Sequence, residues 1–561
     1  MLLRLVPALT LLLLIGPVAA GLVGTALPAF GYLPILGQTD FNLDSWRNLL
    51  AAPGLMISLK LSWITGFATT LISLSIVVLF CAAWYGTRLF ARMQRLLSPL
   101  LAIPHVTVAF GLAFLLAPSG WIMRLLSPWA TGFSRPPDVT LIQDSYGAAL
   151  IAGLVIKETP FLLLMTLAAL GQADAARTSM LARSMGYGPI AAWLKTVFPR
   201  IYPQLRLPIF AVLAYSVSVV DVALVLAPST PAPLGVRLVA WFNDPDLSLR
   251  FMASSGAILQ LLLAIAAILI WCGLELIGRY LGRWWLRSGH RGVDDRVFRL
   301  IAAVPLLICF AAALTGLSSM VLWSIADHWR YPAALPAGFS WAVWLRHAPE
   351  LIRVAWHTVS IGAVAALLAL ILVMGCLENE VRYGRHPSNR TLWLLYLPLL
   401  APQIAFLFGA QMLLITMDLD GSWLALLWSH LVFVLPYVFL SLSDPYRAWD
   451  ERYSRTARCL GASSVRVFWR IKLPILLRPV LVALAVGFAV SVGQYLPTLF
   501  AGGGRFATLT TEAVALSAGG DRRIIGVYAL MQMVMPFIAF TLALALPTWL
   551  FRQRRALQIA Q

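Results

Sequence analysis

The chain has 561 residues, of which 60% are hydrophobic and only 12% are charged, and its mean hydropathy is +0.84. Soluble domains carry about 25% charged residues, so this composition excludes a soluble globular protein and indicates a polytopic membrane protein. The formal net charge of +19 falls in short loops between apolar runs. There it marks orientation in the membrane, and we expect no nucleic-acid partner.

Apolar runs of about twenty residues predict an all-α polytopic membrane protein with about 12 transmembrane helices, six in each half. In the first half the runs lie near 5–29, 55–83, 98–117, 147–170, 206–228 and 253–279. In the second half they lie near 298–321, 352–376, 392–416, 423–443, 479–500 and 524–551. The first run is similar to a signal peptide as far as Ala20. It continues to about Phe30, so we expect an uncleaved first helix.

The loops between these runs alternate in charge. One side carries basic residues, among them Arg88, Arg92, Arg95, Arg279, Arg283, Arg287, Arg382, Arg385, Arg552 and Arg554. The other side carries acidic residues, among them Asp40, Asp44, Asp138, Asp144, Asp244, Asp246, Asp418 and Asp420. Because cytoplasmic loops collect Lys and Arg, we predict that the basic side and both termini are cytoplasmic.

The two halves repeat one another. Pro53 and Pro349 each precede a span with a glycine at the same spacing, Gly66 and Gly362. Further matching pairs are His105 with Gln403, Phe110-Gly111 with Phe408-Gly409, and Pro160-Phe161 with Pro436-Tyr437. Duplication and fusion with parallel halves predict a first transmembrane domain at 1–285, a cytoplasmic linker at 286–297 and a second transmembrane domain at 298–561.

One amphipathic loop motif occurs on the basic side in both halves. Its first copy contains Ala182, Arg183, Gly186, Trp193 and Pro199, and its second contains Ala457, Arg458, Gly461, Phe468 and Pro474. Residues 172–185 and 447–460 are predicted as short helices that end at the glycines, because glycine suits the left-handed residue that closes a helix. A second short helix follows to each proline, which can begin the next span.

Such a helix–turn–helix could present its apolar face to a soluble partner, with basic residues at the rim. The alternative is a hairpin that lies on the bilayer surface. Two copies with the same glycine-to-proline spacing favour the docking interpretation.

Polar residues within the spans require an explanation, because charges at bilayer depth cost at least about 2.5–3.5 kcal/mol on insertion scales. The candidates for a translocation path between the halves are Asp221, Glu158, Gln494, Gln403 and His105. The two carboxylates would then face a cationic solute. The alternative is a structural ion pair of Lys157 with Glu158 or Asp221.

Motifs of catalysis and metal binding are absent from the sequence. There is no Gly-x-x-x-x-Gly-Lys-[Ser/Thr] phosphate loop, so any ATP hydrolysis that drives this protein would have to occur on a separate subunit. The five cysteines have no metal-ligand spacing, and no nucleophile elbow or His-Glu-x-x-His motif occurs. We therefore expect a protein that is not an enzyme and holds neither metal nor cofactor.

The repeated loop resembles the EAA loop of permease subunits of bacterial binding-protein-dependent ABC importers, in which it docks on the cytoplasmic ATPase. Gly186 and Gly461 match that loop's glycine, and Ala182 and Ala457 its second alanine, whereas Met180 and Arg455 stand where its glutamate belongs. The resemblance covers essentially the whole chain. It implies two permease domains similar to those of type I ABC importers, in the bacterial inner membrane.

The resemblance also implies the partners and a substrate class. The partners are a cytoplasmic ABC ATPase dimer, which holds ATP and Mg, a periplasmic solute-binding protein and the lipid bilayer. The stretch 500–513 resembles thiamine-type transport permeases, which makes thiamine the expected cationic solute, with iron(III) and polyamines as alternatives. An ion-coupled secondary transporter, with Asp221 and Glu158 as coupling carboxylates, is the alternative from another class.

Overall fold

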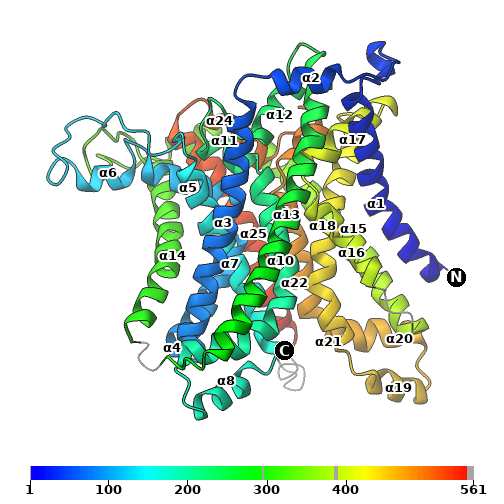
Figure 1. Ribbon diagram of the computed structural model, residues 1–561. Helices are drawn as coiled ribbons and strands as arrows, with labels where there is room; N and C mark the ends of the chain where they lie inside the picture. The colour runs from blue at the N-terminus through cyan, green and yellow to red at the C-terminus, as the bar shows by residue number, and fades with distance from the viewer. Residues whose placement is uncertain (1, 293–295, 385–388, 553–561) are drawn as a thin grey trace.

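The structure is a computed structural model that describes residues 2–292, 296–384 and 389–552 (Figure 1). Within these ranges the chain is helical, apart from two isolated bridges in loops. The long helices of the first half are α1 (Leu2–Ala29), α3 (Leu55–Trp84), α7 (Ala148–Gln172), α10 (Phe198–Ser218) and α13 (Leu249–Arg287). Those of the second half are α14 (Arg296–Ile325), α15 (Ala342–Tyr383), α18 (Trp423–Arg447), α22 (Leu477–Val492) and α25 (Arg522–Leu550).

Shorter helices complete the bundle and its two ends. Within it lie α4 (Arg88–Ala102), α5 (His105–Leu116), α11 (Asp221–Leu226), α16 (Asn389–Leu400), α17 (Gln403–Thr416) and α23 (Leu496–Gly502). At the upper end in Figure 1 lie α2 (Asp44–Ala51), α6 (Trp121–Leu126), α12 (Leu234–Phe242) and α24 (Leu509–Ser517). At the lower end lie α8 (Ala175–Ser184), α9 (Pro189–Ala192), α19 (Glu451–Cys459), α20 (Ser464–Val467) and α21 (Leu473–Ile475).

The all-helical membrane fold is confirmed, but the count of spans differs from the twelve predicted. Among the described residues, nine helices are long and apolar enough to cross a membrane, or up to eleven if two bent pairs each count as one span. The predicted span near 206–228 is the one missing from both counts. It is divided between α10 and α11, and prolines at 199, 203 and 208 with Arg200 and Arg206 shorten the apolar stretch of α10.

Broken helices occur at matching places in the two halves. Pro104 separates α4 from α5, and Pro402 separates α16 from α17, where the two helices meet at 93°. Val219 and Val220 separate α10 from α11, and residues 493–495 separate α22 from α23. Main-chain groups freed at such a break must find partners within the protein, since the hydrocarbon core of a membrane provides none.

The first helix of each half packs against the other half. Helix α1 contacts α17 and α15, whereas α14 contacts α5, α3 and α7. Glycines allow the backbones to meet. A Cβ on Gly24 would lie 2.9 Å from the Gly409 Cα, and one on Gly316 would lie 3.0 Å from the Gly111 carbonyl carbon. The matching pairs Phe110-Gly111 and Phe408-Gly409 are therefore the places where α14 and α1 each pack against the opposite half.

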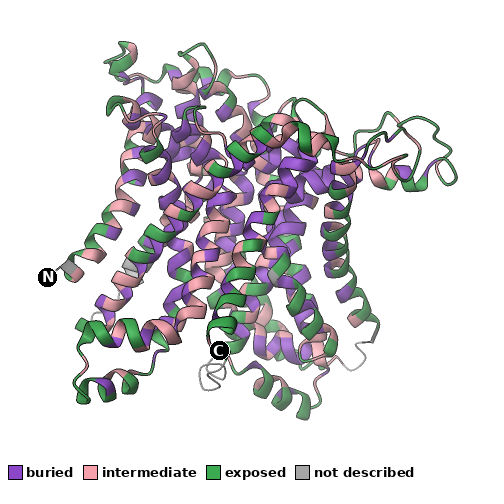
Figure 2. Cartoon of the chain, turned by 180° about the vertical axis from the view of Figure 1, so that it is seen from behind, coloured by how far each residue is buried: buried purple, intermediate pink, exposed green. Residues whose placement is uncertain are grey.

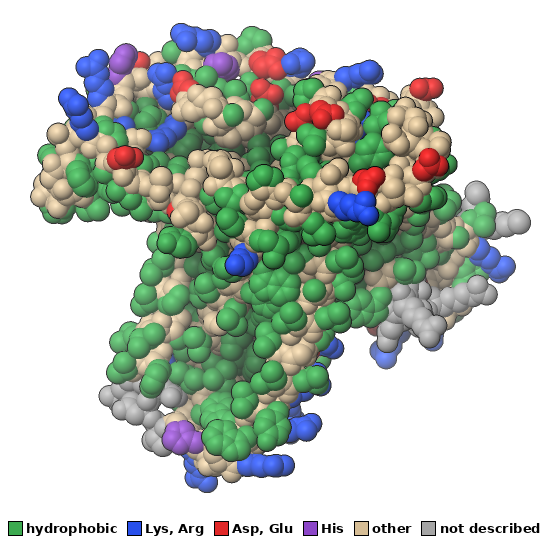
Figure 3. All heavy atoms as spheres, turned by 45° about the horizontal axis from the view of Figure 1, so that its top comes forward, with side chains coloured by type: hydrophobic (Ala, Val, Ile, Leu, Met, Phe, Trp, Pro, Cys, Tyr) green, Lys and Arg blue, Asp and Glu red, His purple; other side chains and the backbone are tan. Residues whose placement is uncertain are grey.

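The distribution of buried residues reflects the packing of α1 and α14 against the opposite halves. Two large apolar clusters form the interior, one with α14 and α25 packed on first-half helices and the other with α1, α12 and α13 packed on second-half helices. Figure 2 shows the buried residues concentrated along the inner helices. Figure 3 shows hydrophobic side chains covering the sides of the molecule, with charged side chains gathered at its ends, as expected for a bilayer-spanning protein.

The glycine seat predicts a packing defect in Gly24→Ala. The added methyl group would meet the α17 backbone, so we expect a loss of about 1–3 kcal/mol of stability, the usual range for overpacking. The measurement is thermal unfolding of the purified protein in detergent. The matched control is Gly16→Ala in the same helix, where the nearest atom is the tip of Leu12 at 3.9 Å. Equal melting temperatures for the two variants would contradict the tight contact.

Candidate docking loops and translocation path

The first loop motif is built around the end of α8. Gly186 has a φ of +85°, and its N–H donates to the Arg183 carbonyl at 3.0 Å. The next amide, of Tyr187, donates to the Ala182 carbonyl at 3.3 Å. This pair of hydrogen bonds is the Schellman motif, in which a left-handed residue lets the chain turn back over the helix end.

The second loop motif repeats that geometry at the end of α19. Gly461 has a φ of +83°, its N–H donates to the Arg458 carbonyl at 2.9 Å, and the Ala462 N–H donates to the Ala457 carbonyl at 3.0 Å. The side chains of Ala182 in α8 and Ala457 in α19 are both buried. The glycine of each motif is therefore explained by one backbone turn made twice, at the same end of the molecule (Figure 1), and the small alanine by its burial.

The aromatic residue and the proline of each motif frame a single π-helical turn, Trp193–Val197 in the first loop and Phe468–Lys472 in the second. Pro199 and Pro474 follow each turn by two residues and cannot donate a helical hydrogen bond, which favours an irregular turn there. Trp193 is fully buried and Phe468 is half-buried. Both residues therefore pack within the protein and shape the loop from inside.

The exposed faces of the loops carry large apolar side chains among basic ones. The side chains at least 60% exposed include Met180, Leu181, Met185, Leu460, Val465 and Trp469. Clustered exposed apolar residues rimmed by charge are typical of a protein interface. Of these residues, the sequence analysis singled out only Met180.

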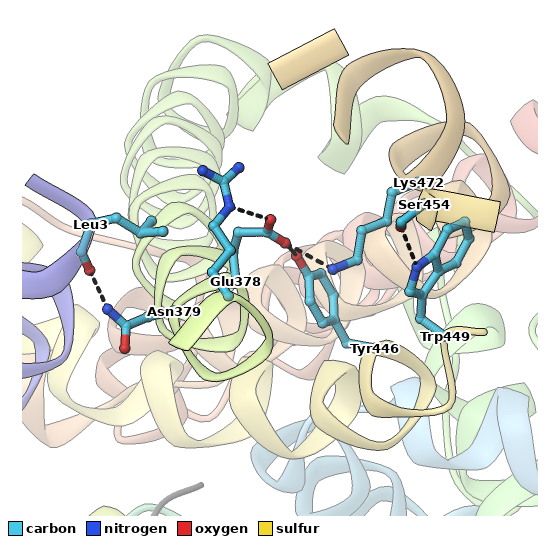
Figure 4. Close-up of polar contacts among 8 residues, drawn as sticks. Leu3, Glu378, Asn379, Tyr446, Trp449, Ser454 and Lys472 are labelled. Atoms are coloured by element: carbon cyan, nitrogen blue, oxygen red, sulfur yellow. Dashed lines mark hydrogen bonds and ion pairs between the residues drawn. The ribbon is translucent and has the colours of Figure 1, made fainter. Parts of the chain in front are cut away.

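Each loop is fastened to the bundle by a buried lysine. Lys195 Nζ donates to the carbonyls of Trp285 at 3.2 Å, in the last turn of the membrane helix α13, and of His290 at 2.7 Å, just beyond that helix. Removal from water lowers the pKa of Lys195 from that of a free lysine. Lys472 instead donates to the Glu378 carboxylate of α15 at 2.8 Å (Figure 4).

Three of the five predicted path residues come together at the centre of the bundle. His105 Nε2 lies 3.1 Å from Glu158 Oε1. Tyr215 stacks obliquely on the His105 ring, with centroids 5.0 Å apart, and donates its hydroxyl to Asp221 Oδ1 at 3.2 Å. Helices α5, α7, α10 and α11 thus bring one histidine, one tyrosine and two carboxylates into one cluster, which we name the carboxylate cluster.

The structural ion pair considered for Lys157 is not formed. Lys157 Nζ donates to the carbonyls of Leu101 at 3.1 Å and Ile103 at 2.5 Å, at the break between α4 and α5. Glu158, the next residue on α7, points to His105 instead. The lysine therefore satisfies freed main-chain carbonyls, and the carboxylate belongs to the cluster.

The second half contributes to this cluster through residues that the sequence analysis did not select. Gln494 is buried at the break before α23 and Gln403 begins α17, but in the described chain no hydrogen bond joins either to Glu158 or Asp221. Tyr437 of α18 lies within electrostatic range of Glu158, and Tyr495 within range of Asp221. The sequence signal for Tyr437 is the repeat itself, which aligns Pro436-Tyr437 with Pro160-Phe161.

Other polar groups have structural partners. His430 is fully buried, with Nδ1 2.7 Å from Ser491 Oγ and Nε2 2.9 Å from Thr498 Oγ1, so it joins helices of the second half. In the part of the chain that the structure describes, no group of three or more His, Cys, Asp or Glu residues could hold a metal ion.

Comparisons with known proteins agree with this architecture. A family described as "Binding-protein-dependent transport system inner membrane component" matches residues 366–552. The "Inner membrane ABC transporter permease protein YnjC" of Escherichia coli (strain K12) is 34% identical over 524 residues, covering 92% of this chain and 93% of the relative.

Two further relatives are more distant. The "Thiamine transport system permease protein ThiP" of Escherichia coli (strain K12) is 24% identical over 90% of this chain and 91% of the relative. The "Spermidine/putrescine transport system permease protein PotC" of Haemophilus influenzae is 26% identical over 35% of this chain and 78% of the relative.

Full-length similarity at this level, together with the helical bundle, shows the family. Its systems include a separate ATPase, which binds the ATP, and a periplasmic binding protein, so this chain is neither the enzyme nor the holder of a cofactor. The chain belongs to the multi-pass inner-membrane permeases of binding-protein-dependent ABC transport systems.

Proposed function

We propose that this permease carries a small cationic solute, such as thiamine, from the periplasm to the cytoplasm, driven by ATP hydrolysis on two partner ATPase subunits. The observation that carries the proposal is the combination of two identical loop turns at one end of the molecule with a carboxylate cluster in the first half that Tyr437 and Tyr495 of the second half adjoin. Family membership favours this importer over an ion-coupled secondary transporter.

We assign the orientation from charge. The end with α8 and α19 carries a basic second loop, whereas the opposite end in Figure 3 mixes acidic and basic side chains. Cytoplasmic loops collect Lys and Arg, so both docking loops and both termini are assigned to the cytoplasm. The permease domains are assigned to 1–285 and 298–561, joined by the linker 286–297.

The path is assigned to the carboxylate cluster, with Gln494 and Gln403 along the same boundary between the halves. Glu158 and Asp221 attract a cation, and Tyr215, Tyr437 and Tyr495 offer ring faces that favour organic cations. ThiP and PotC are named for thiamine and for spermidine and putrescine, which are organic cations. Thiamine ranks first because ThiP is similar over nearly the whole chain.

ATP acts in this scheme as a ligand that favours one conformation of the complex. Closure of the ATPase pair brings the two docking loops together, and the halves rock so that the path opens to the other side. Such a change is a population shift, whose size is limited by the difference in ATP affinity between the two states.

The docking assignment predicts that Gly461→Trp weakens ATPase binding. A tryptophan is strained at a φ of +83° and would project beside the exposed loop face, where a Cβ on Gly461 meets no atom within 4 Å. A binding loss of 1.4 kcal/mol is about tenfold in affinity, and we expect at least about that loss. The measurement is the amount of co-expressed ATPase recovered with the tagged permease.

The matched control is Gly504→Trp, a glycine with a φ of +74° and open surroundings at the opposite end of the molecule. It should recover ATPase as the unmodified chain does. Full recovery with Gly461→Trp, or equal loss with both variants, would count against the docking loops.

The path assignment predicts that Asp221→Asn lowers uptake of labelled thiamine by about tenfold or more, because one lost charge contact in a low-dielectric site is worth at least about 1.4 kcal/mol. ATPase recovery should be unchanged. The control is Asp246→Asn, a carboxylate exposed in the loop after α12. Normal uptake by Asp221→Asn would remove it from the path. Uptake of spermidine or iron(III) in place of thiamine by the unmodified system would correct the substrate.

A further inference from the structure

The second docking loop is tied to the membrane helices by one buried carboxylate. Glu378, in the last two turns of α15, accepts from Lys472 Nζ at 2.8 Å, from the Tyr446 hydroxyl at 2.6 Å and from Arg382 Nε at 2.8 Å (Figure 4). Lys472 belongs to the π turn of the loop, whereas Tyr446 belongs to α18. Only 4% of the Lys472 side chain and 13% of the Glu378 side chain is exposed.

This contact brings three elements together in a low-dielectric place. A carboxylate with three donors is held in position, because charge-assisted hydrogen bonds are shorter and stronger than neutral ones. A second pair, Arg447 with Glu380 at 3.0 and 3.1 Å, joins the same two membrane helices two residues further along α15 and one further along α18. Movement of Lys472 must therefore move the ends of α15 and α18 or break a buried ion pair.

Helix α18 connects this anchor to the carboxylate cluster. Tyr437 lies on α18 nine residues before Tyr446, which is about 13.5 Å along a helix at 1.5 Å per residue. Tyr437 is an α18 side chain that lies within electrostatic range of Glu158. Pro436 and Pro445 each precede one of these tyrosines and remove a helical hydrogen bond, so the segment between them can shift as a unit.

The first docking loop is attached differently: its lysine binds main-chain carbonyls, and its π turn continues directly into α10, the helix that carries Tyr215. Lys195 binds the carbonyls of Trp285 and His290, and the Gly188 N–H donates to the Arg291 carbonyl at 2.9 Å. Its partners lie beyond the membrane-buried part of α13, next to the junction of the two halves. The fastening of the two loops is therefore different although their turns are identical.

We propose that Glu378 is a positioning residue that transmits movement of the second docking loop to α18, and through α18 to Tyr437 at the carboxylate cluster. The inference rests on the proposed function, because it requires an ATPase on the docking loops. The second loop then acts on the cluster through α18, whereas the π turn of the first loop continues into α10, which carries Tyr215.

The test follows position 437 in the assembled complex, so no knowledge of the substrate is required. The permease with Tyr437→Cys is reconstituted in nanodiscs with its ATPase, and reaction with a water-soluble maleimide is measured by mass spectrometry, with and without ATP and vanadate. With Glu378 in place, we expect ATP to change the labelling rate at position 437 about tenfold, the size of a 1.4 kcal/mol population shift. In the Glu378→Gln background the rate should not respond to ATP.

The matched control is Glu350→Gln, the same change on the same helix, where the carboxylate pairs with Arg353 on the exposed far end. It should respond to ATP as the parent does. Tyr446→Phe is a second variant, which removes one hydroxyl and leaves the ring and the Lys472 pair in place. We expect it to reduce the response while ATPase recovery and ATP hydrolysis remain.

Four results separate the possibilities. An equal response with Glu378→Gln and its parent, or no response in the parent while ATPase is bound, overturns the coupling role. Loss of ATPase binding in both Glu378→Gln and Tyr446→Phe also overturns it, because the contact would then only shape the loop. Failure of the unmodified chain to bind any ATPase would overturn the proposed function itself.

Discussion

The close contact between glycine backbones holds the two halves together. Gly24 of α1 rests on Gly409 of α17, and Gly316 of α14 rests on Gly111 of α5. The Gly409 N–H also donates to Thr25 Oγ1 at 2.9 Å. In a bilayer the hydrophobic effect does not drive helices together, so close approach through small residues and hydrogen bonds must do so. Exchange of the first helices places second-half helices beside the first-half cluster, where a path between halves can form.

Broken helices are the second constraint. Each break frees main-chain groups at bilayer depth, where each unsatisfied group costs several kcal/mol. Lys157 meets this need at the break between α4 and α5 by donating to two freed carbonyls. The break in turn places His105 at the start of α5, facing Glu158.

One chain of hydrogen bonds also crosses between the halves. Gln532 of α25 accepts from Thr107 of α5 at 2.8 Å and donates to Thr510 of α24 at 2.6 Å.

The two docking loops share their outer form and differ in their attachments. The left-handed glycines and π turns agree in both copies. The lysines beneath them differ in position and partner. Lys195 binds main-chain carbonyls at the end of α13, next to the junction of the two halves. Lys472 binds the carboxylate of Glu378 on the membrane helix α15.

The sequence by itself determined the membrane class, most of the helices, and both loop turns. These follow from local properties: apolar length, the left-handed preference of glycine, and proline at a helix start. It also selected Glu158, Asp221 and His105, because a charge within an apolar run is visible without a structure. Tertiary structure alone decided that Lys157 binds carbonyls, that Gln403 and Gln494 make no hydrogen bond to the carboxylates, and that Tyr437 and Tyr495 approach them. These outcomes depend on helix rotation and on the exchange of α1 and α14, which no periodicity within one segment encodes.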